Sequence, residues 1–273
     1  MLRVLSLGAG VQSSVVALMS AAGELPPIDH AIFADTGWEP KAVYDWLHGY
    51  LIPRLPFPVH IVAKGNLREE QIVARVRGSK KVEGDARWAS LPYYTMEAGA
   101  AREGTIRRQC TGEYKIQPIE KKIRELIGLK PRQRYPKEVV VQQWLGISMD
   151  EMQRMKFSTD GWREFWHPLV TKRMTRWDCL QWLERNGHPK APRSACIGCP
   201  FHSNEKWRRM RDETPDEWQD AVEFDRAIRV SGGRRGETFL HRSCVPLDKV
   251  DLLTPADRGQ LSFLDECSGV CGV

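Results

Sequence analysis

The stretch VLSLGAGVQSS, at positions 4–14, constrains the fold more than any other part of the sequence. Its apolar start ends abruptly in glycines and serines, and a second apolar run follows. This pattern predicts a buried strand over Val4–Leu7, a tight turn, and a helix over Ser14–Ala22 that is capped by Ser13 or Ser14. Such a turn exposes backbone N–H groups and places little side chain in the way of a ligand.

Strand and helix patterns alternate through the first half of the chain. Further strand-like runs lie at 30–37 (HAIFADTG), 57–63 (FPVHIVA) and 137–148 (KEVVVQQWLGIS). Between them apolar residues recur at helical spacing, at Ala42, Trp46 and Leu47 and again at Ile116, Ile119, Ile123, Leu126 and Ile127. The alternation predicts an α/β fold with a mostly parallel, doubly wound sheet.

The remaining segments suggest how the chain is organised. The stretch at 77–108 is rich in Gly and Arg with weak periodicity, so we expect a loop region near the site. From about Met174 onward the pattern is helical and irregular, including 217–229. We therefore expect an α/β core at 1–173, a helical, cysteine-bearing appendage at 174–264 packed on that core, and a flexible tail at 265–273.

The composition is that of an ordinary globular protein. Of 273 residues, 41% are hydrophobic and 28% charged, and no apolar stretch approaches the roughly 20 residues needed to cross a bilayer. Glycines interrupt the N-terminal apolar run, unlike a signal peptide, so we expect a cytoplasmic protein with no membrane partner. A net charge of +6 favours anionic partners such as nucleotides or nucleic acid. Seven cysteines in that compartment indicate metal binding or catalysis more than disulfides.

The Gly/Ser turn predicts an anion site, and the anion expected there is a phosphate. Ligands of a parallel sheet bind beyond the carboxyl ends of its strands, and a helix N-terminus there adds N–H donors and positive charge. In this turn glycines allow close approach and serines offer hydroxyls, at Gly8 and Gly10 and at Ser6, Ser13 and Ser14. The alternative is a strand–helix turn that binds nothing. Asp35, at the next strand end, could accept from a ribose hydroxyl or an adenine amine, or cap a helix.

Two cysteines stand in a tight C-x-x-C turn. Cys196 and Cys199, in CIGCP, are spaced so that both thiolates can reach one metal or form a redox disulfide, and Gly198 lets the turn close. The pair alone leaves metal binding, redox chemistry and neither open. Cys179, inside WDCLQWL, is expected to be a packed core thiol.

Several blocks in order along the chain resemble the phosphoadenosine phosphosulfate (PAPS) reductase-like branch of the adenine nucleotide alpha hydrolase superfamily. They are FADTGWEPKAVYDWL, RRQCTGEYKIQPI, LGISMDEMQR, HPLVTKRMTRWDCLQWL and CIGCPFHS, at 33–47, 107–119, 145–154, 167–183 and 196–203. The opening turn is similar to the PP-loop of that superfamily, but it is longer and has Gln12 where Asp is expected. The resemblance implies an adenine nucleotide alpha hydrolase-like fold that binds ATP or another adenine nucleotide. Phosphate contacts would come from Ser6, Gly8, Gln12, Ser13 and Ser14, with Asp35 and Thr36 beside the nucleotide.

The RRQC block resembles the cluster-bearing cysteine segment of the family and so adds Cys110 to the C-x-x-C pair. Together Cys110, Cys196 and Cys199 could hold a [4Fe–4S] cluster, with a fourth ligand from Cys244 or an open coordination site. An open iron could hold hydrosulfide for transfer, as the resemblance to cluster-dependent thiolating enzymes implies. Zinc in a Cys₄ site is the alternative, with the same sequence signature.

The C-terminal sequence DECSGVCGV contains two more cysteines. Glu266–Cys267 resembles the mobile Glu-Cys-Gly segment in which sulfonucleotide reductases carry their catalytic cysteine, although Ser268 follows here in place of Gly. Cys267 and Cys271 could cycle between dithiol and disulfide, or carry a persulfide. A disordered tail with incidental cysteines is the alternative.

Basic and aromatic residues extend the candidate site. Arg107, Arg108 and Lys115 lie near Cys110, where cations would hold sulfate or phosphate and lower a thiol pKa. Arg154 could be a second oxyanion contact or could pair with Asp150 or Glu151.

The segment KWRRMR, at 206–211, leaves two interpretations open. It could track nucleic acid with Trp207 stacking on a base, or form a solvated helix face with one buried aromatic. His202 could donate a hydrogen bond beside a metal site, or lie in the core.

These features predict a PAPS reductase-like enzyme of sulfur transfer. It would adenylate an acceptor with ATP, such as a nucleobase or a DNA phosphate, alone or presented by a partner protein, and then insert sulfur from a donor. The alternative reaction is reduction of PAPS or adenylyl sulfate to sulfite through Cys267, with a thioredoxin-like reductant. A third possibility is a non-catalytic nucleic-acid-binding module with a structural zinc, which the altered loop favours.

Overall fold

Five parallel strands form the central sheet of the computed structural model, which describes residues 1–76, 90–96, 103–229, 237–254 and 257–258. Their order across the sheet is β3–β2–β1–β6–β7, with bounds Val59–Ala63, His30–Asp35, Leu2–Leu7, Val141–Leu145 and Arg163–Trp166. Strand β1 pairs with β2 on one side and with β6 on the other, so the order of connection reverses between β1 and β6. The predicted α/β fold with a parallel sheet is confirmed.

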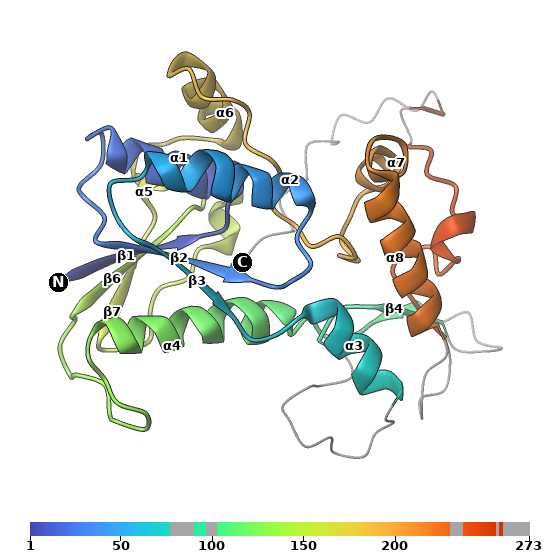
Figure 1. The fold of residues 1–273 in the computed structure, drawn as a ribbon, viewed down its shortest axis with the longest axis horizontal. Coiled ribbons are helices and arrows are strands. Elements are labelled where there is room, and N and C mark those ends of the chain that lie inside the picture. The colour runs from blue at the N-terminus through green and yellow to red at the C-terminus, as the bar shows by residue number, and fades with distance from the viewer. Residues whose placement is uncertain (77–89, 97–102, 230–236, 255–256, 259–273) are drawn as a thin grey trace.

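Helices cover both faces of this sheet (Figure 1). On one face lie α1 (Val11–Ala21), α5 (Pro168–Thr171) and α6 (Arg176–Arg185), and on the other lies α4 (Gln117–Leu126). The first face is sealed by a large apolar core that includes Leu5, Val15 and Trp182, and the second by a smaller one around Ile32 and Ile123. Shorter helical segments are α2 (Lys41–Tyr44), η1 (Asp45–Leu51), η2 (Ile52–Arg54) and η4 (Met149–Arg154).

A second group of elements packs beside the sheet, on the right of Figure 1. It contains α3 (Leu67–Val76), α7 (Asn204–Glu213), α8 (Pro215–Ile228) and a small antiparallel sheet of β5 (Glu103–Thr105), β4 (Tyr94–Met96) and β8 (Glu237–Phe239). Two further short helices are η3 (Thr111–Ile116) and η5 (Leu247–Lys249). Its core is built on fully buried aromatic rings, among them Tyr93, Tyr114, Trp207 and Phe224.

The expected helical C-terminal region is therefore present, while the domain boundary at residue 173 stays a prediction. Packing crosses that position in both directions: α6 follows it but packs on α1, and α3 precedes it but packs on α8. The expected flexible tail at 265–273 lies outside the described residues. No helix within the described ranges combines the length and apolar character needed to span a membrane.

Several local predictions are corrected. Helix α1 begins at Val11 after Gly10, so Ser13 and Ser14 lie inside its first turn and do not cap it. Their hydroxyls serve other partners: Ser13 Oγ accepts from Gly8 N–H, and Ser14 Oγ from the indole of Trp46. The sequence pattern also missed β7, and the expected loop at 77–108 contains β4 and β5.

Gly146 allows the close approach between the end of β6 and α1. A Cβ at this position would lie 2.8 Å from both the backbone N and Cα of Ser13, closer than real Cβ atoms come to backbone. Neither segment can move easily, because the residues around them are buried in the core of the sheet.

We therefore expect Gly146→Ala to destabilise the protein by about 1–3 kcal/mol through overpacking. The matched control is Gly49→Ala, since a Cβ there meets nothing within 4 Å. Within a helical segment it should be neutral or stabilise by up to about 1 kcal/mol. Urea unfolding of both variants measures the difference, and equal midpoints would contradict the proposed contact.

Candidate functional site

The turn between β1 and α1 lies where the strand order reverses, which is the usual ligand position of an open parallel sheet. The backbone is left-handed at Ala9 (φ 53°), and α1 starts directly after Gly10. No described side chain caps α1, and its first turn carries no acidic residue. The first N–H groups of a helix have no partner within the helix. An anion at this edge would accept from them.

Gln12 and Ser6 face the turn from inside the fold. The amide of Gln12 donates to Ser148 Oγ at 3.4 Å and accepts from the guanidinium of Arg176 at 3.0 Å. Ser6 Oγ accepts from the side chain of Gln143 at 2.8 Å. Both residues are buried, so their described contacts tie the loop to β6 and α6.

Asp35 and Thr36, at the end of β2, have different neighbours. Asp35 Oδ1 accepts from the N–H of Gly37 at 2.8 Å and from the hydroxyl of Tyr44 at 2.7 Å, so its carboxylate stabilises the turn after the strand. The N-cap of α2 is Pro40, so Asp35 does not cap that helix. Thr36 Oγ1 lies 3.4 Å from the Sγ of Cys196. Thr36 therefore belongs to the cysteine cluster as well as to the strand end.

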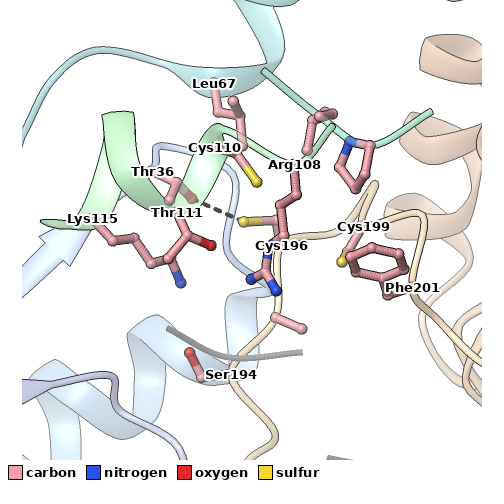
Figure 2. Close-up of a pocket in the computed structure, with 13 residues that line it drawn as sticks. Thr36, Leu67, Arg108, Cys110, Thr111, Lys115, Ser194, Cys196, Cys199 and Phe201 are labelled. Atoms are coloured by element: carbon pink, nitrogen blue, oxygen red, sulfur yellow. Dashed lines mark hydrogen bonds between the residues drawn. The ribbon is translucent and has the colours of Figure 1, made fainter. Parts of the chain in front are cut away.

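Three cysteines line one small pocket, which we call the thiol pocket (Figure 2). Cys110 enters from the start of η3, and Cys196 and Cys199 from the loop before α7. The backbone N–H of Cys110 donates to Ser90 O at 2.7 Å, and that of Cys199 to Cys196 O at 3.1 Å. The cavity measures about 30 Å³, and its other polar or aromatic lining residues include Thr36, Arg108, Lys115, Ser194 and Phe201.

A buried ion pair stands against these thiols. Lys115 Nζ lies 3.1 Å from Glu39 Oε1, and the side chain of Glu39 is fully buried. The same oxygen accepts from Thr36 Oγ1 at 3.2 Å and from the Cys196 thiol at 3.6 Å, while Oε2 has no partner among the described residues. Burial alone would lower the pKa of Lys115, but the Glu39 carboxylate and the neighbouring Cys196 raise it above its usual value. Lys115 therefore stays protonated beside the cysteines.

Burial also sets the state of the thiols. It raises the pKa of Cys110 and of Cys196, although Arg108 and Lys115 respectively oppose the shift. Both thiols are therefore protonated near neutral pH. Since the thiolate is the nucleophile and the metal ligand, they become reactive only when something displaces the proton, as a bound metal does.

The C-x-x-C turn is fixed by two aromatic neighbours. His202 Nε2 lies 3.0 Å from Cys196 O and 3.1 Å from Ile197 O, so this nitrogen carries the hydrogen and donates to both carbonyls. Burial lowers the pKa of His202 to about 3, and the ring stays neutral. Gly198 packs under the ring of Trp38, which is held by a 2.6 Å hydrogen bond to Asp220.

The thiol pocket and the α1 turn share a wall. A Cβ at Gly10 would lie 3.3 Å from the Cβ of Ser194, and Ser194 also lines the pocket. The N-terminus of α1 and the three cysteines therefore face the same edge of the sheet, on either side of one residue.

Other candidate residues lie elsewhere. Of the described cysteines, Cys179 and Cys244 do not line the thiol pocket. Cys179 is buried in the core, as expected, while Cys244 forms a buried turn with left-handed backbone. Its role as a fourth ligand stays a prediction. Cys267 and Cys271 lie outside the described residues.

The arginines predicted for the site also lie in different places. Arg108 lines the pocket, with its guanidinium 5.6 Å from the centre of the Phe201 ring, whereas Arg107 is exposed and does not. Arg154 forms an ion pair with Glu151 at 2.8 Å. Trp207 is fully buried, so its ring is not available to stack on a base.

Two residues of the site had no signal in the sequence pattern. Glu39 and Trp38 follow the ADTG turn, and their residue types alone do not show that either is buried. Only contacts with Lys115 and Gly198, which are distant in the chain, give them a role.

Within the described part of the chain, no three or more His, Cys, Asp or Glu side chains are arranged to hold one metal ion. The three pocket cysteines nevertheless supply a soft sulfur donor set of the kind that iron–sulfur clusters and zinc use.

Comparison with solved structures yields distant likenesses, among them one to a reductase. No family model and no curated protein matches the chain. The phosphate complex of phosphoadenylyl-sulfate (PAPS) reductase from Candida auris superimposes with a TM-score of 0.43 and 15% sequence identity, over 69% of this chain and 74% of that one. A likeness this distant assigns no activity.

The contact between Gly198 and Trp38 can be tested directly. A Cβ at Gly198 would come within 2.6 Å of Trp38 Cζ3, and the tryptophan is 3% exposed, with its ring centre 4.5 Å from that of Phe224. Gly198→Ala should therefore cost about 1–3 kcal/mol in urea unfolding. Gly112→Ala, close to Cys110 but with open space around its Cβ, should leave stability nearly unchanged. A greater loss of stability in Gly112→Ala than in Gly198→Ala would disprove the contact.

Proposed function

We propose that this chain is an adenine-nucleotide-dependent enzyme of sulfur transfer that uses a cysteine-bound [4Fe–4S] cluster. One observation carries the proposal: three thiols and the uncapped N-terminus of α1 flank Ser194 at the same edge of the sheet. A nucleotide held by the helix would then present its phosphates next to the sulfur ligands.

The nucleotide half of the proposal is supported by the loop geometry. The free N–H groups of α1 suit the phosphates of ATP, and the absence of an acidic residue in the first turn leaves their positive field uncancelled. Lys115 and Arg108, which line the thiol pocket, are placed to hold an oxyanion that extends toward the cysteines.

The cluster half is supported by the donor set and its spacing. The ligands of a single zinc ion lie about 2.3 Å from the same metal, so their sulfurs must gather closely. In a cluster each cysteine binds a different iron, so three cysteines that line one pocket can serve together as its ligands. Cys110, Cys196 and Cys199 would be the ligands, and binding of the cluster would displace their thiol protons. With three cysteine ligands, one iron of the cluster would have no ligand from the protein. That iron would hold sulfur for transfer.

Metal content tests this half. Cys110→Ala, Cys196→Ala and Cys199→Ala should each lose most of the iron and acid-labile sulfide found in the anaerobically purified protein, because three ligands must act together. Cys179→Ala is the matched control and should keep both, since Cys179 lies in the core away from the pocket. Zinc in place of iron would support the binding-module alternative, and unchanged iron in the three variants would contradict the shared site.

The nucleotide half has its own test. Gly8→Asp would place a carboxylate next to the α1 turn, where its Cβ has room, 3.6 Å from Ser13 Oγ. Gly8→Asp should weaken ATP binding roughly tenfold or more by charge repulsion. Asn has the size of Asp without its charge, so the affinity of Gly8→Asn for ATP should stay closer to that of the unsubstituted protein. Isothermal titration calorimetry measures both. Equal affinities would rule out an anion site here. Release of sulfite from PAPS, abolished by Cys267→Ser, would instead favour the reductase.

A further inference from the structure

A serine, a histidine and an asparagine form a chain of hydrogen bonds between the loop after β8 and the start of α7. Ser243 Oγ lies 2.7 Å from His241 Nδ1, and His241 Nε2 lies 3.1 Å from Oδ1 of Asn204, the first residue of α7. None of the three lines the thiol pocket. Ser243 is exposed, whereas His241 is only 3% exposed. A molecule in solution can therefore approach the serine, while the histidine ring is shielded from water.

The neighbouring donors fix where the protons of this chain lie. The backbone N–H of Ser243 donates to His241 Nδ1 at 3.1 Å, so this ring nitrogen carries no hydrogen and can only accept. The single N–H of the neutral ring is therefore at Nε2, which donates to Asn204 Oδ1. Because Nδ1 has no hydrogen, the hydroxyl of Ser243 must be the donor in the 2.7 Å contact.

Asn204 is itself held in one orientation. Its Nδ2 donates to the carbonyl oxygen of Asp251 at 3.3 Å and to that of Leu253 at 3.2 Å, and a carbonyl oxygen can only accept. The oxygen of the same amide must therefore be the atom that faces the ring of His241. Asn204 thus keeps His241 in the tautomer that accepts from the hydroxyl of Ser243.

The charges around the ring suit a base. Burial and, to a smaller extent, the charge of Arg242 lower the pKa of His241 to about 4, so the ring is neutral at physiological pH. Its Nδ1 lone pair is therefore free of a proton and points at the serine hydroxyl. Arg242 is exposed and stands between the two residues in the chain. A cation there favours the negative charge that develops on a substrate oxygen during attack.

We propose that Ser243 is a nucleophile that takes the acyl group of an activated carboxylic ester, with His241 as its general base and Asn204 as a positioning residue. A nucleophile, a base within hydrogen-bond reach and a third group that orients the base are the arrangement that activates serine in unrelated folds.

The step balances without any further reactant. Ser243 Oγ bonds to the acyl carbon, and the bond from that carbon to the alcohol oxygen breaks. The proton of the serine passes to His241 Nδ1 and from there to the leaving alcohol. This activity goes beyond the proposed function and does not depend on it.

The test treats the full-length protein with a fluorophosphonate, whose phosphorus bonds to the oxygen of an activated serine as fluoride leaves. Peptide mapping by mass spectrometry should place the adduct on Ser243 in the folded protein, and unfolding in urea should prevent labelling. Labelling should also block the release of p-nitrophenol from p-nitrophenyl acetate, which measures the acyl step.

His241→Asn should slow labelling roughly a hundredfold, the size of effect expected from loss of a general base. Asparagine can still accept from the N–H two residues later, so this variant keeps the local turn without the base. The matched control is Ser158→Ala, since the described contacts of the Ser158 hydroxyl are with the backbone of Asp160. This control should be labelled at the rate of the unsubstituted protein.

Three outcomes would overturn the inference. The first is the absence of an adduct on Ser243 in the folded protein, which needs no variant to establish. The second is an equal labelling rate in His241→Asn, which would make the serine an ordinary exposed hydroxyl. The third is unchanged release of p-nitrophenol after complete labelling, which would mean that Ser243 takes no acyl group. None depends on iron content or ATP affinity, so failure here is distinguishable from failure of the proposed function.

Discussion

The close packing around the first turn of α1 is the constraint on which the site depends. Gly146 lies against the backbone of Ser13 on one side, and Ser194 lies against Gly10 on the other. The helix is buried along nearly its whole length, so it cannot slide to relieve either contact. Its unpaired N–H groups are therefore held at the sheet edge at a cost that a bound anion can offset.

The thiol pocket shows how a fold can keep cysteines ready but unreactive. Burial favours the neutral thiol, while the nearby Lys115 and Arg108 favour the thiolate. A buried ion pair such as Glu39–Lys115 contributes little stability by itself, because the desolvation of two charges opposes their attraction. Its clearest consequence here is local: it keeps one positive and one negative group fixed against Cys196.

The sequence was sufficient for the main architecture because the inner strands β1, β2 and β6 are largely buried, and β1 and β2 read as nearly continuous apolar runs. Strand β7 (REFW) was not predicted from the sequence because it is an edge strand with a charged residue at each of its first two positions. Strands β4, β5 and β8 have only three residues each, too few for a periodic pattern. The capping error at α1 arose because the helix starts at Val11, ahead of the serines, with no capping side chain.

Spacing and residue type located the cysteines and the loop, since these signals are local. The partners that organise the site were not local. The burial of Glu39 depends on Lys115, and the importance of Gly198 depends on Trp38, each distant in the chain. Such pairs are decided by tertiary packing, which a single sequence does not display.

The placement of Cys110 at the head of η3 has a consequence for assembly. That short helix continues directly into α4, which covers one face of the sheet, whereas Cys196 and Cys199 arrive only after β6, β7 and α6 have been laid down. The pocket therefore joins two parts of the chain that β6, β7 and α6 separate in the sequence. A group bound by all three thiols would cross-link η3, and through it α4, to the loop before α7.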